Sequence, residues 1–228
     1  MISLQTDLSK NQFNHVAMNG TTIHLVDDDA GLRKALSRLL RAEGYDVRAF
    51  ASAAEFLDAC HAQEIECLLL DVSMPDLDGL ELQRRLVRSG ATVPIVFLTG
   101  YGDIPMSVRA VKAGAVDFLT KPVGESELLA AVRAALVQSS ADRNEREETA
   151  RTAARFSRLT PREREVLDGV VAGKPNKIIA AELGTCEQTV KVHRGRVMEK
   201  MGAESLAELV RSADRIGALK KLAVCKAG

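Results

Sequence analysis

The architecture of this chain follows from one stretch of its sequence, CLLLDVSMPDLDG at residues 67–79. The leading residues are apolar, they end at Asp71, and turn-forming Met-Pro and Asp-Gly pairs follow at once. A short apolar run bounded by turn formers predicts a strand that is buried on both faces, as in a parallel sheet. Asp71 would then stand at the carboxyl end of a central strand, where open α/β sheets bind their ligands.

The simplest alternative is that Asp71 only caps the helix that follows it, as an isolated Asp after an apolar run often does. Three other apolar runs argue against this, since each of them also ends in polar groups. An Asp triplet at residues 27–29 follows one run, Thr99 follows a second, and Lys121 follows a third. Parallel strands end at the same edge of a sheet, so these acids, the hydroxyl and the amine would meet there as one site.

Strands and helices alternate along the first part of the chain. Strands are predicted at 22–26, 46–50, 67–70, 93–98 and 116–120. A helix is predicted to follow each strand. The first helix ends near Gly44, and the second and third cover 52–62 and 79–88. The last two are marked by apolar residues at helical spacing, namely Ile104, Val108 and Val111, and Leu128, Leu129, Val132 and Leu136. This alternation predicts an α/β fold over residues 21–138, a doubly wound five-stranded parallel sheet of flavodoxin-like type, for which strand order 2-1-3-4-5 is common. Residues 1–20 are expected to form a flexible leader.

The chain of 228 residues is long enough for two domains, and its charge differs between its two parts. Residues 1–138 carry 13 Lys or Arg and 18 Asp or Glu, which is a net charge of −5. Residues 157–228 carry 14 and 9, which is a net charge of +5. The basic part is therefore expected to bind a polyanion.

Cysteine usage and hydropathy indicate a cytoplasmic protein with no membrane partner. The four cysteines form no CxxC motif and no metal-ligand cluster with the four histidines, so they are expected to be reduced thiols. No run approaches the ~18 apolar residues that a membrane span needs, and the N-terminus lacks a basic-then-apolar signal.

The remaining sequence divides into a charged segment and a small helical domain. Residues 139–156 alternate in charge and contain few apolar residues, which predicts a solvated helical linker. In residues 157–228, the stretch TPRE at 160–163 is a capping box with Pro at the first helical position. A second capping box at 185–188 is expected to open a basic helix over 188–201. Two short helices joined by a Gly turn, the second one basic, predict an all-α helix-turn-helix domain.

Several motifs resemble those of a known family. The first part resembles the receiver domain of two-component response regulators in VDDD (26–29), LLLDVSMPDLDG (68–79), VFLTGYGD (96–103) and DFLTKP (117–122). The second part resembles the LuxR-type helix-turn-helix in LTPREREVL (159–167), NKIIAAELG (176–184) and TVKVHRGRVMEKMG (189–202). Together the two parts are similar to the FixJ/NarL class of transcriptional regulators.

The resemblance implies a phosphoryl-accepting site at the predicted sheet edge. Asp71 would accept a phosphoryl group from a sensor histidine kinase. Thr99 and Lys121 would contact the phosphoryl oxygens. Phe118 would occupy the aromatic switch position that responds to Thr99, where the family more often has Tyr.

The same resemblance implies a divalent cation at this edge, Mg²⁺ or Mn²⁺. Its ligands would be Asp27, Asp28, Asp71 and the backbone carbonyl of Ser73. Elementary electrostatics agrees, because three carboxylates in one pocket repel one another unless a cation lies among them, and Mg²⁺ prefers oxygen ligands.

The predicted helix over 188–201 has two distinct faces. One face, expected to be buried, carries Val190, Val197 and Met201. The opposite face carries Gln188, Lys191, Val192, Gly195 and Arg196. We expect Lys191 to bind guanine and Val192 to pack on a thymine methyl group in the major groove of double-stranded DNA. Phosphate contacts are expected from Lys177, Thr189, Arg194, Arg196 and Lys200.

The whole chain is therefore expected to be a phosphorylation-controlled transcription factor. It would dimerise when phosphorylated, bind promoter DNA and act with RNA polymerase, and it would be no enzyme beyond its own phosphoryl transfer and dephosphorylation. A phosphatase with an aspartyl-phosphate intermediate is disfavoured, because such enzymes typically carry a second Asp two residues after the first, where this chain has Ser73. The other alternative is a phosphate-independent DNA-binding regulator whose first domain is a protein-docking module. The complete set of acids, Thr99 and Lys121 argues against it.

Overall fold

The computed structural model describes residues 20–100 and 114–226 and contains two compact units that divide between Asp142 and Arg143. This division falls inside the segment that the sequence predicts as a linker, 139–156. The helix predicted around Ile104, Val108 and Val111 lies outside the described residues.

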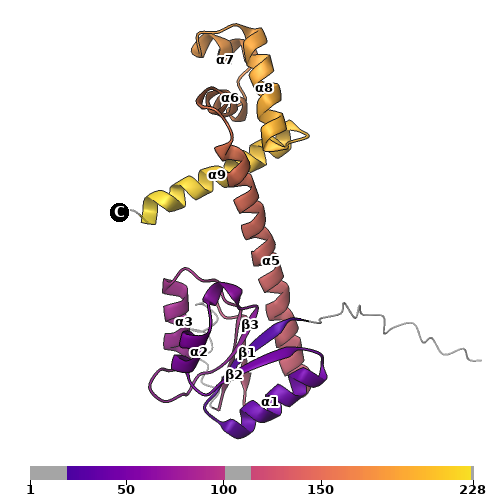
Figure 1. The fold of residues 1–228 in the computed structure, drawn as a ribbon, viewed down its shortest axis with the longest axis vertical. Coiled ribbons are helices and arrows are strands. Elements are labelled where there is room, and N and C mark those ends of the chain that lie inside the picture. The colour runs from indigo at the N-terminus through magenta and orange to yellow at the C-terminus, as the bar shows by residue number, and fades with distance from the viewer. Residues whose placement is uncertain (1–19, 101–113, 227–228) are drawn as a thin grey trace, which may run out of the picture. The chain divides into compact units, whose positions relative to one another are not determined.

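The first unit is an α/β structure in which helices flank a central sheet (Figure 1). Its strands are β1 (Thr22–Val26), β2 (Asp46–Phe50), β3 (Cys67–Asp71), β4 (Ile95–Thr99) and β5 (Asp117–Thr120). Its described helices are α1 (Ala30–Ala42), α2 (Ala53–Ala59), a 3₁₀ turn (Ala62–Glu64), α3 (Gly79–Arg88) and the first part of α5 (Glu125–Ser157). The predicted alternation of strands and helices is confirmed for the residues that the structure describes.

All neighbouring strands are parallel, and their order across the sheet is β2-β1-β3-β4-β5. This is the order that the sequence favours, and it makes the sheet doubly wound. The central strand is β3, in which every residue from Cys67 to Asp71 is buried. The prediction of a strand buried on both faces is therefore confirmed, and Asp71 stands at its carboxyl end.

Helices cover both faces of the sheet, because successive side chains of a strand point to opposite faces. On one face, Leu69 and Leu98 pack with apolar residues of α1 and α5. On the other face, Leu70 and Phe97 pack with apolar residues of α2 and α3. Burial of both faces leaves the carboxyl edge of the sheet as the place where polar side chains of the strands can gather.

The second predicted helix is shorter than the sequence suggests. Helix α2 ends at Ala59 instead of continuing to residue 62. Cys60 is extended, with φ −130° and ψ 136°, so it leaves the helical region. A short 3₁₀ turn at Ala62–Glu64 follows before β3 begins.

Helix α5 is longer than any helix predicted from the sequence. It runs from Glu125 to Ser157 and so includes both the last helix of the first domain and the segment 139–156. The predicted linker is therefore helical, and it continues the helix before it. Charged side chains pair along its surface, as Glu147 and Arg151 do at 3.1 Å.

The second unit contains four further helices in its described part, α6 (Pro161–Val171), α7 (Asn176–Glu182), α8 (Glu187–Met201) and α9 (Leu206–Lys226). Their shared apolar core includes Val166, Leu167, Ile179, Val190, Val197 and Leu209. The turn between α7 and α8 contains Gly184 with φ +59°, a left-handed conformation that glycine adopts readily. The predicted all-α helix-turn-helix domain is confirmed.

The helix starts of the second unit confirm one predicted capping box and contradict the other. The Thr160 hydroxyl accepts the N–H of Glu163 at 3.3 Å, and the Glu163 carboxylate accepts the N–H of Thr160 at 2.9 Å. In the second box, the N-cap is Cys186 and no side-chain hydrogen bond closes the motif. Thr185 lies one residue before the N-cap, and its N–H donates to the carbonyl of Ala180 at 2.9 Å in the turn that ends α7, so this N–H is not available to the Gln188 side chain as a capping box requires.

Candidate functional site

The polar groups predicted for one site meet at the carboxyl edge of the sheet. Asp27 follows β1, Asp71 ends β3, Thr99 ends β4 and Lys121 follows β5. These four strands are neighbours, so segments far apart in the sequence bring their side chains to one place. Asp27, Asp71 and Thr99 are only 0%, 3% and 1% exposed to solvent.

Lys121 joins two of the acids directly. Its Nζ lies 2.7 Å from Oδ2 of Asp27 and 2.9 Å from Oδ2 of Asp71. The backbone N–H of Lys121 donates to the carbonyl of Thr99 at 2.6 Å, which holds the start of this side chain beside β4. The ammonium group thus compensates two buried carboxylates that would be costly to leave unpaired.

Burial and neighbouring charges both shift the pKa values of Asp71 and Lys121. Burial raises the pKa of the Asp71 carboxyl, the hydrogen bond from Lys121 opposes this, and the charge of Asp27 adds to it. Burial by itself would lower the pKa of Lys121, but its hydrogen bonds to Asp27 and Asp71 outweigh burial and raise the pKa. One cation between two acids leaves net negative charge, so the pocket favours a further cation.

Backbone hydrogen bonds orient the two buried acids. Oδ1 of Asp27 accepts the N–H of Asp29 at 2.9 Å. Oδ1 of Asp71 accepts the N–H of Ser73 at 3.2 Å. Each carboxylate therefore has one oxygen fixed by the loop that follows it and the other bonded to Lys121.

Asp27, Asp28 and Asp71 form a candidate metal site. One carboxylate oxygen from each lies within 4.8 Å of the other two. Asp28 is exposed, so the group is open to solvent on one side. These donors fit Mg²⁺ or Mn²⁺, which prefer oxygen ligands and retain bound water. The predicted role of the Ser73 carbonyl as a further ligand stays a prediction.

Thr99 and Phe118 lie on adjacent strands at this edge. β4 and β5 pair in parallel, with Thr99 opposite Thr120 and Phe97 opposite Phe118. The ring of Phe118 is half-buried, and its centroid lies 6.1 Å from that of Phe97. The two residues are therefore placed where a switch between them is feasible, and that switch stays a prediction.

Two charged residues shape the site in ways that the sequence reasoning missed. Arg33 of α1 donates from Nη1 to the backbone carbonyl of Asp27 at 2.6 Å. Asp29 caps α1 and accepts the N–H of Gly31 at 2.7 Å. An Asp directly before a helical pattern is a known N-cap signal, so the role of Asp29 could have been found, whereas that of Arg33 left no local signal.

Gly79 also belongs to the site, whereas the sequence predicts only a turn at its Asp-Gly pair. A Cβ at this position would lie 2.2 Å from the backbone oxygen of Asp71. The N–H of Gly79 donates to the carbonyl of Val72 at 3.0 Å. The start of α3 therefore rests directly on the backbone of Asp71, which only glycine allows.

Helix α8 has the two faces that the sequence predicts. Its buried face carries Val190, Val197 and Met201, which are 0%, 0% and 1% exposed. Its exposed face carries Gln188, Lys191, Val192, Gly195 and Arg196. Lys177, on α7, is exposed as well. This arrangement leaves a mixed basic and apolar surface exposed on α8.

Three of the predicted phosphate-binding residues have partners within the second unit. Nζ of Lys200 lies 2.7 Å from Oε2 of Glu163, a residue that is 2% exposed. Nη1 of Arg194 donates to Oδ1 of Asn176 at 3.2 Å. The Thr189 hydroxyl lies 3.1 Å from Sγ of Cys186. The structure thus gives Lys200 a role in holding α8 to α6 that the sequence did not indicate, and the phosphate contacts stay predictions.

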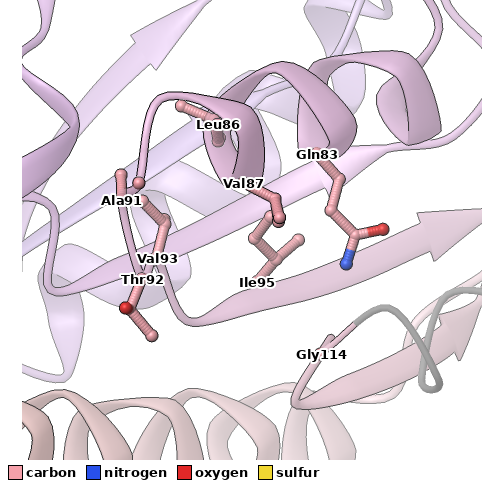
Figure 2. A pocket seen from close by; sticks show the side chains of 9 residues that line it. Gln83, Leu86, Val87, Ala91, Thr92, Val93, Ile95 and Gly114 are labelled. Carbon is pink, nitrogen blue, oxygen red and sulfur yellow. The ribbon is translucent and has the colours of Figure 1, made fainter. Parts of the chain in front are cut away.

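The first unit also contains a cavity of about 270 Å³ away from these groups (Figure 2). Figure 2 shows Leu86 and Val87 of α3 above Ile95 at the amino end of β4, with Gly114 at the rim. The predicted site lies at the opposite, carboxyl ends of the strands. None of the residues that line the cavity has an ionisable side chain, so it offers no groups for phosphoryl chemistry.

Comparison with known proteins gives two family matches along the chain. Residues 23–133 match the response regulator receiver domain. Residues 157–213 match the luxR family of bacterial regulatory proteins. Within the described residues, no helix combines the length and apolar character needed to cross a membrane.

Relatives and solved structures match over most of the chain. Nodulation protein W of Bradyrhizobium diazoefficiens is 46% identical, covering 86% of each chain. Transcriptional regulatory protein FixJ of the same organism is 43% identical, covering 86% of this chain and 96% of its own. The structure of response regulator StyR is 44% identical with a TM-score of 0.76, covering 86% of this chain and 98% of its own. Full-length FixJ from B. japonicum is 42% identical with a TM-score of 0.54, covering 88% and 98%.

Proposed function

Because this chain belongs to the two-component response regulators that join a receiver domain to a LuxR-type DNA-binding domain, we propose that phosphorylation of Asp71 controls its binding to DNA. A sensor histidine kinase donates the phosphoryl group, and the phosphorylated chain dimerises and binds promoter DNA to regulate transcription. One observation carries the proposal: Asp71 lies at the sheet edge with Asp27 and Lys121, 2.9 Å from the Lys121 ammonium.

Transfer to Asp71 exchanges one bond to phosphorus for another. A carboxylate oxygen of Asp71 attacks the phosphorus of the kinase phosphohistidine, the P–N bond breaks, and the imidazole leaves with the electron pair and takes up a proton. The receiver supplies position and charge for this step rather than covalent chemistry of its own. Lys121 offers positive charge to the phosphoryl oxygens, and Thr99 offers a hydroxyl group.

The acids at this edge are proposed to hold Mg²⁺ or Mn²⁺ through Asp27, Asp28, Asp71 and the backbone carbonyl of Ser73. When bound, such a cation neutralises charge on the transferring phosphoryl oxygens. The clustering of three carboxylates, each with an oxygen within 4.8 Å of the others, supports this assignment. Lys121 supplies one positive charge against the three negative charges of these carboxylates.

The acceptor assignment is tested by intact-mass measurement of the full chain after incubation with acetyl phosphate and Mg²⁺. The wild type is expected to gain one phosphoryl group and Asp71→Asn none. Asp46→Asn removes an exposed acid at the start of β2 and serves as the control, which should label like the wild type. A wild type that binds DNA but is never labelled would favour the phosphate-independent docking module instead.

The metal assignment has its own test in the same assay. EDTA is expected to abolish labelling, because the clustered carboxylates then repel both one another and the incoming phosphoryl group. Asp28→Ala is expected to label at least about tenfold more slowly with an unchanged circular dichroism spectrum, since Asp28 is exposed and carries little packing. Labelling that persists in EDTA contradicts the metal site.

DNA recognition is assigned to α8 of the second unit. Lys191 and Val192 face base edges in the major groove of double-stranded DNA, beside Gln188. The remaining basic and polar groups on and near α8 bind phosphates, namely Lys177, Thr189, Arg194, Arg196 and Lys200. The exposure of Lys191 and Val192 together on one face supports this assignment.

The proposal also sets the wider context of the protein. It acts in the cytoplasm, where a kinase and promoter DNA are both accessible, and it works with RNA polymerase at its target promoters. It catalyses no reaction other than its own phosphoryl transfer and dephosphorylation.

A further inference from the structure

The C-terminal part of α5 packs against the helix-turn-helix. Phe156 contacts the apolar core of the second unit, and Leu159, just after α5, belongs to that core with 3% exposure. Thr152 is 5% exposed, and Oε1 of Glu148 lies 2.5 Å from Nη1 of Arg215 on α9. Positions four residues apart lie on one face of a helix. This face of α5 is therefore part of the second unit, although the sequence indicated only a solvated linker there.

Arg155 lies beside this face and reaches the end of α8. Its Nη1 donates to the backbone oxygen of Met201, the last residue of α8, at 3.1 Å. The guanidinium lies against Gly202, where an added Cβ would come within 2.9 Å of Cζ of Arg155. Gly202 has φ +62°, so glycine permits both the left-handed turn and the close approach of Arg155.

The carbonyl of Met201 needs a partner from outside its own helix. The last four carbonyls of an α-helix have no intrahelical N–H to accept. Those of Met198 and Glu199 accept the N–H of Gly202, which follows α8. Arg155 supplies the partner for Met201, and its positive charge is favourable at the negative end of the helix dipole.

We propose that Arg155 is a positioning residue for DNA recognition by α8. The inference rests on the proposed function, in which exposed side chains of α8 contact base edges. Such contacts require the side chains to be held within ~0.5 Å of their productive places. The bond from Arg155 to Met201 fixes the end of α8 to α5, while the ion pair of Lys200 with Glu163 fixes it to α6. Without the hydrogen bond from Arg155 to Met201, α8 still forms, but its C-terminal end shifts.

The test compares full-length variants, each incubated with acetyl phosphate and Mg²⁺, on two DNA probes. One is a site that the wild type enriches from a random-sequence library, and the other is a random-sequence duplex of the same length. Arg155→Ala is expected to lose about tenfold in affinity for the enriched site and clearly less for the random duplex, the loss that one impaired base-pair contact causes. Arg155→Lys is expected to recover part of the loss, because an ammonium group can also donate to the Met201 carbonyl.

Arg151→Ala is the matched control for charge. Arg151 lies one turn earlier on α5, is 73% exposed and pairs with Glu147. Its removal changes the net charge of α5 by the same amount as Arg155→Ala but leaves the end of α8 untouched. We expect Arg151→Ala to match the wild type on both probes.

Hydrogen exchange adds a readout that does not involve DNA. The N–H groups of Gly202 and Ala203 bond to the last turn of α8, so they should exchange faster in Arg155→Ala and not in Arg151→Ala. Equal losses on the two DNA probes, or unchanged exchange at these amides, would overturn the inference. If the wild type enriches a site and Arg155→Ala binds it equally well, only this inference fails. If the wild type enriches no site, the proposed function itself fails.

Discussion

Gly79 brings the start of α3 against the backbone of the residue proposed to accept the phosphoryl group. A Cβ here would lie 2.2 Å from the carbonyl oxygen of Asp71 and 3.1 Å from its carbonyl carbon, so the backbone would have to move. We expect Gly79→Ala to slow labelling of Asp71 by acetyl phosphate about tenfold or more, and to lower the free energy of unfolding by about 1–3 kcal/mol. Mass spectrometry and urea unfolding measure the two effects.

Gly100→Ala is the control for this substitution. Gly100 follows β4 at the same edge of the sheet, and a Cβ there would meet no heavy atom of the described residues within 4 Å. It should label and unfold almost like the wild type. Wild-type labelling and stability in Gly79→Ala would show that this close approach does not position Asp71.

Glu163 carries a charge that stabilises the second unit. The hydrogen bond from Lys200, followed by that from the N–H of Thr160, lowers the pKa of its carboxyl from the usual 4.5 to about 2. The folded state therefore favours the carboxylate, so its contribution is present above pH 4.5 and is lost as the pH falls toward 2. We expect Glu163→Gln to lower the free energy of unfolding at neutral pH by about 1–3 kcal/mol, a difference from the wild type that shrinks in acid.

Glu165, on the same helix α6, provides the control for Glu163→Gln when the free energy of unfolding is measured in urea. Glu165 is 51% exposed and pairs with Arg162 at 2.9 Å. Since exposed ion pairs contribute little, Glu165→Gln should change the free energy of unfolding by less than about 0.5 kcal/mol. If both Gln variants lose the same stability with the same pH dependence, the buried Glu163–Lys200 pair has no special role.

Among the helices, α8 is the one proposed to combine base reading and phosphate binding in one element. Lys191→Ala is expected to cost about 1–3 kcal/mol on the preferred sequence and to relax preference at one base pair. Arg194→Ala is expected to weaken binding to all sequences alike and to reduce the salt dependence by about one phosphate contact. Binding measured on specific and random DNA over a range of salt concentrations separates the two roles.

The assignment of roles on α8 depends on a difference in DNA binding between Lys191→Ala and Arg194→Ala. Arg194 also donates to Asn176, so its variant must first be shown to be folded by circular dichroism. If Lys191→Ala lowers specific and random binding equally, the assignment of base reader and phosphate-binding residue is wrong.

Over the whole molecule, phosphorylation is expected to convert a monomer to a dimer. The phosphoryl group adds about −1.5 to −2 charge at Asp71 and attracts the Thr99 hydroxyl and the Lys121 ammonium. Movement of Thr99 is expected to make room for Phe118 and so to change the surface beside β5. Shifting such an equilibrium from 1:99 to 99:1 requires about 5.5 kcal/mol of differential interaction. Sedimentation with and without acetyl phosphate should therefore show a dimer only in the labelled wild type.

Two variants separate labelling from its consequence. Thr99→Ala should be labelled but remain monomeric, because the group that responds to the phosphoryl oxygens is gone. Asp71→Asn should be neither labelled nor dimeric. Equal monomer fractions of the wild type with and without the phosphoryl donor would refute the coupling.

The elements of this protein and their order were determined by local patterns in its sequence. The apolar run before Asp71 predicted a strand buried on both faces, and the structure shows it at the centre of the sheet. The helical spacing of Val190, Val197 and Met201 predicted the buried face of α8 correctly. Such patterns suffice because the repeat of a strand or helix is set by bonds within a few residues.

Only the tertiary structure decided which side chains meet across the chain. Lys121 bonds Asp27 across 94 positions, and Arg155 bonds Met201 across 46. No local repeat encodes such pairs, because they depend on how whole strands and helices pack. The failed capping box has a local cause instead, since the N–H of Thr185 donates to the carbonyl of Ala180 in the turn that ends α7. The sequence therefore determined which groups reach the carboxyl edge of the sheet, and packing decided how they pair there.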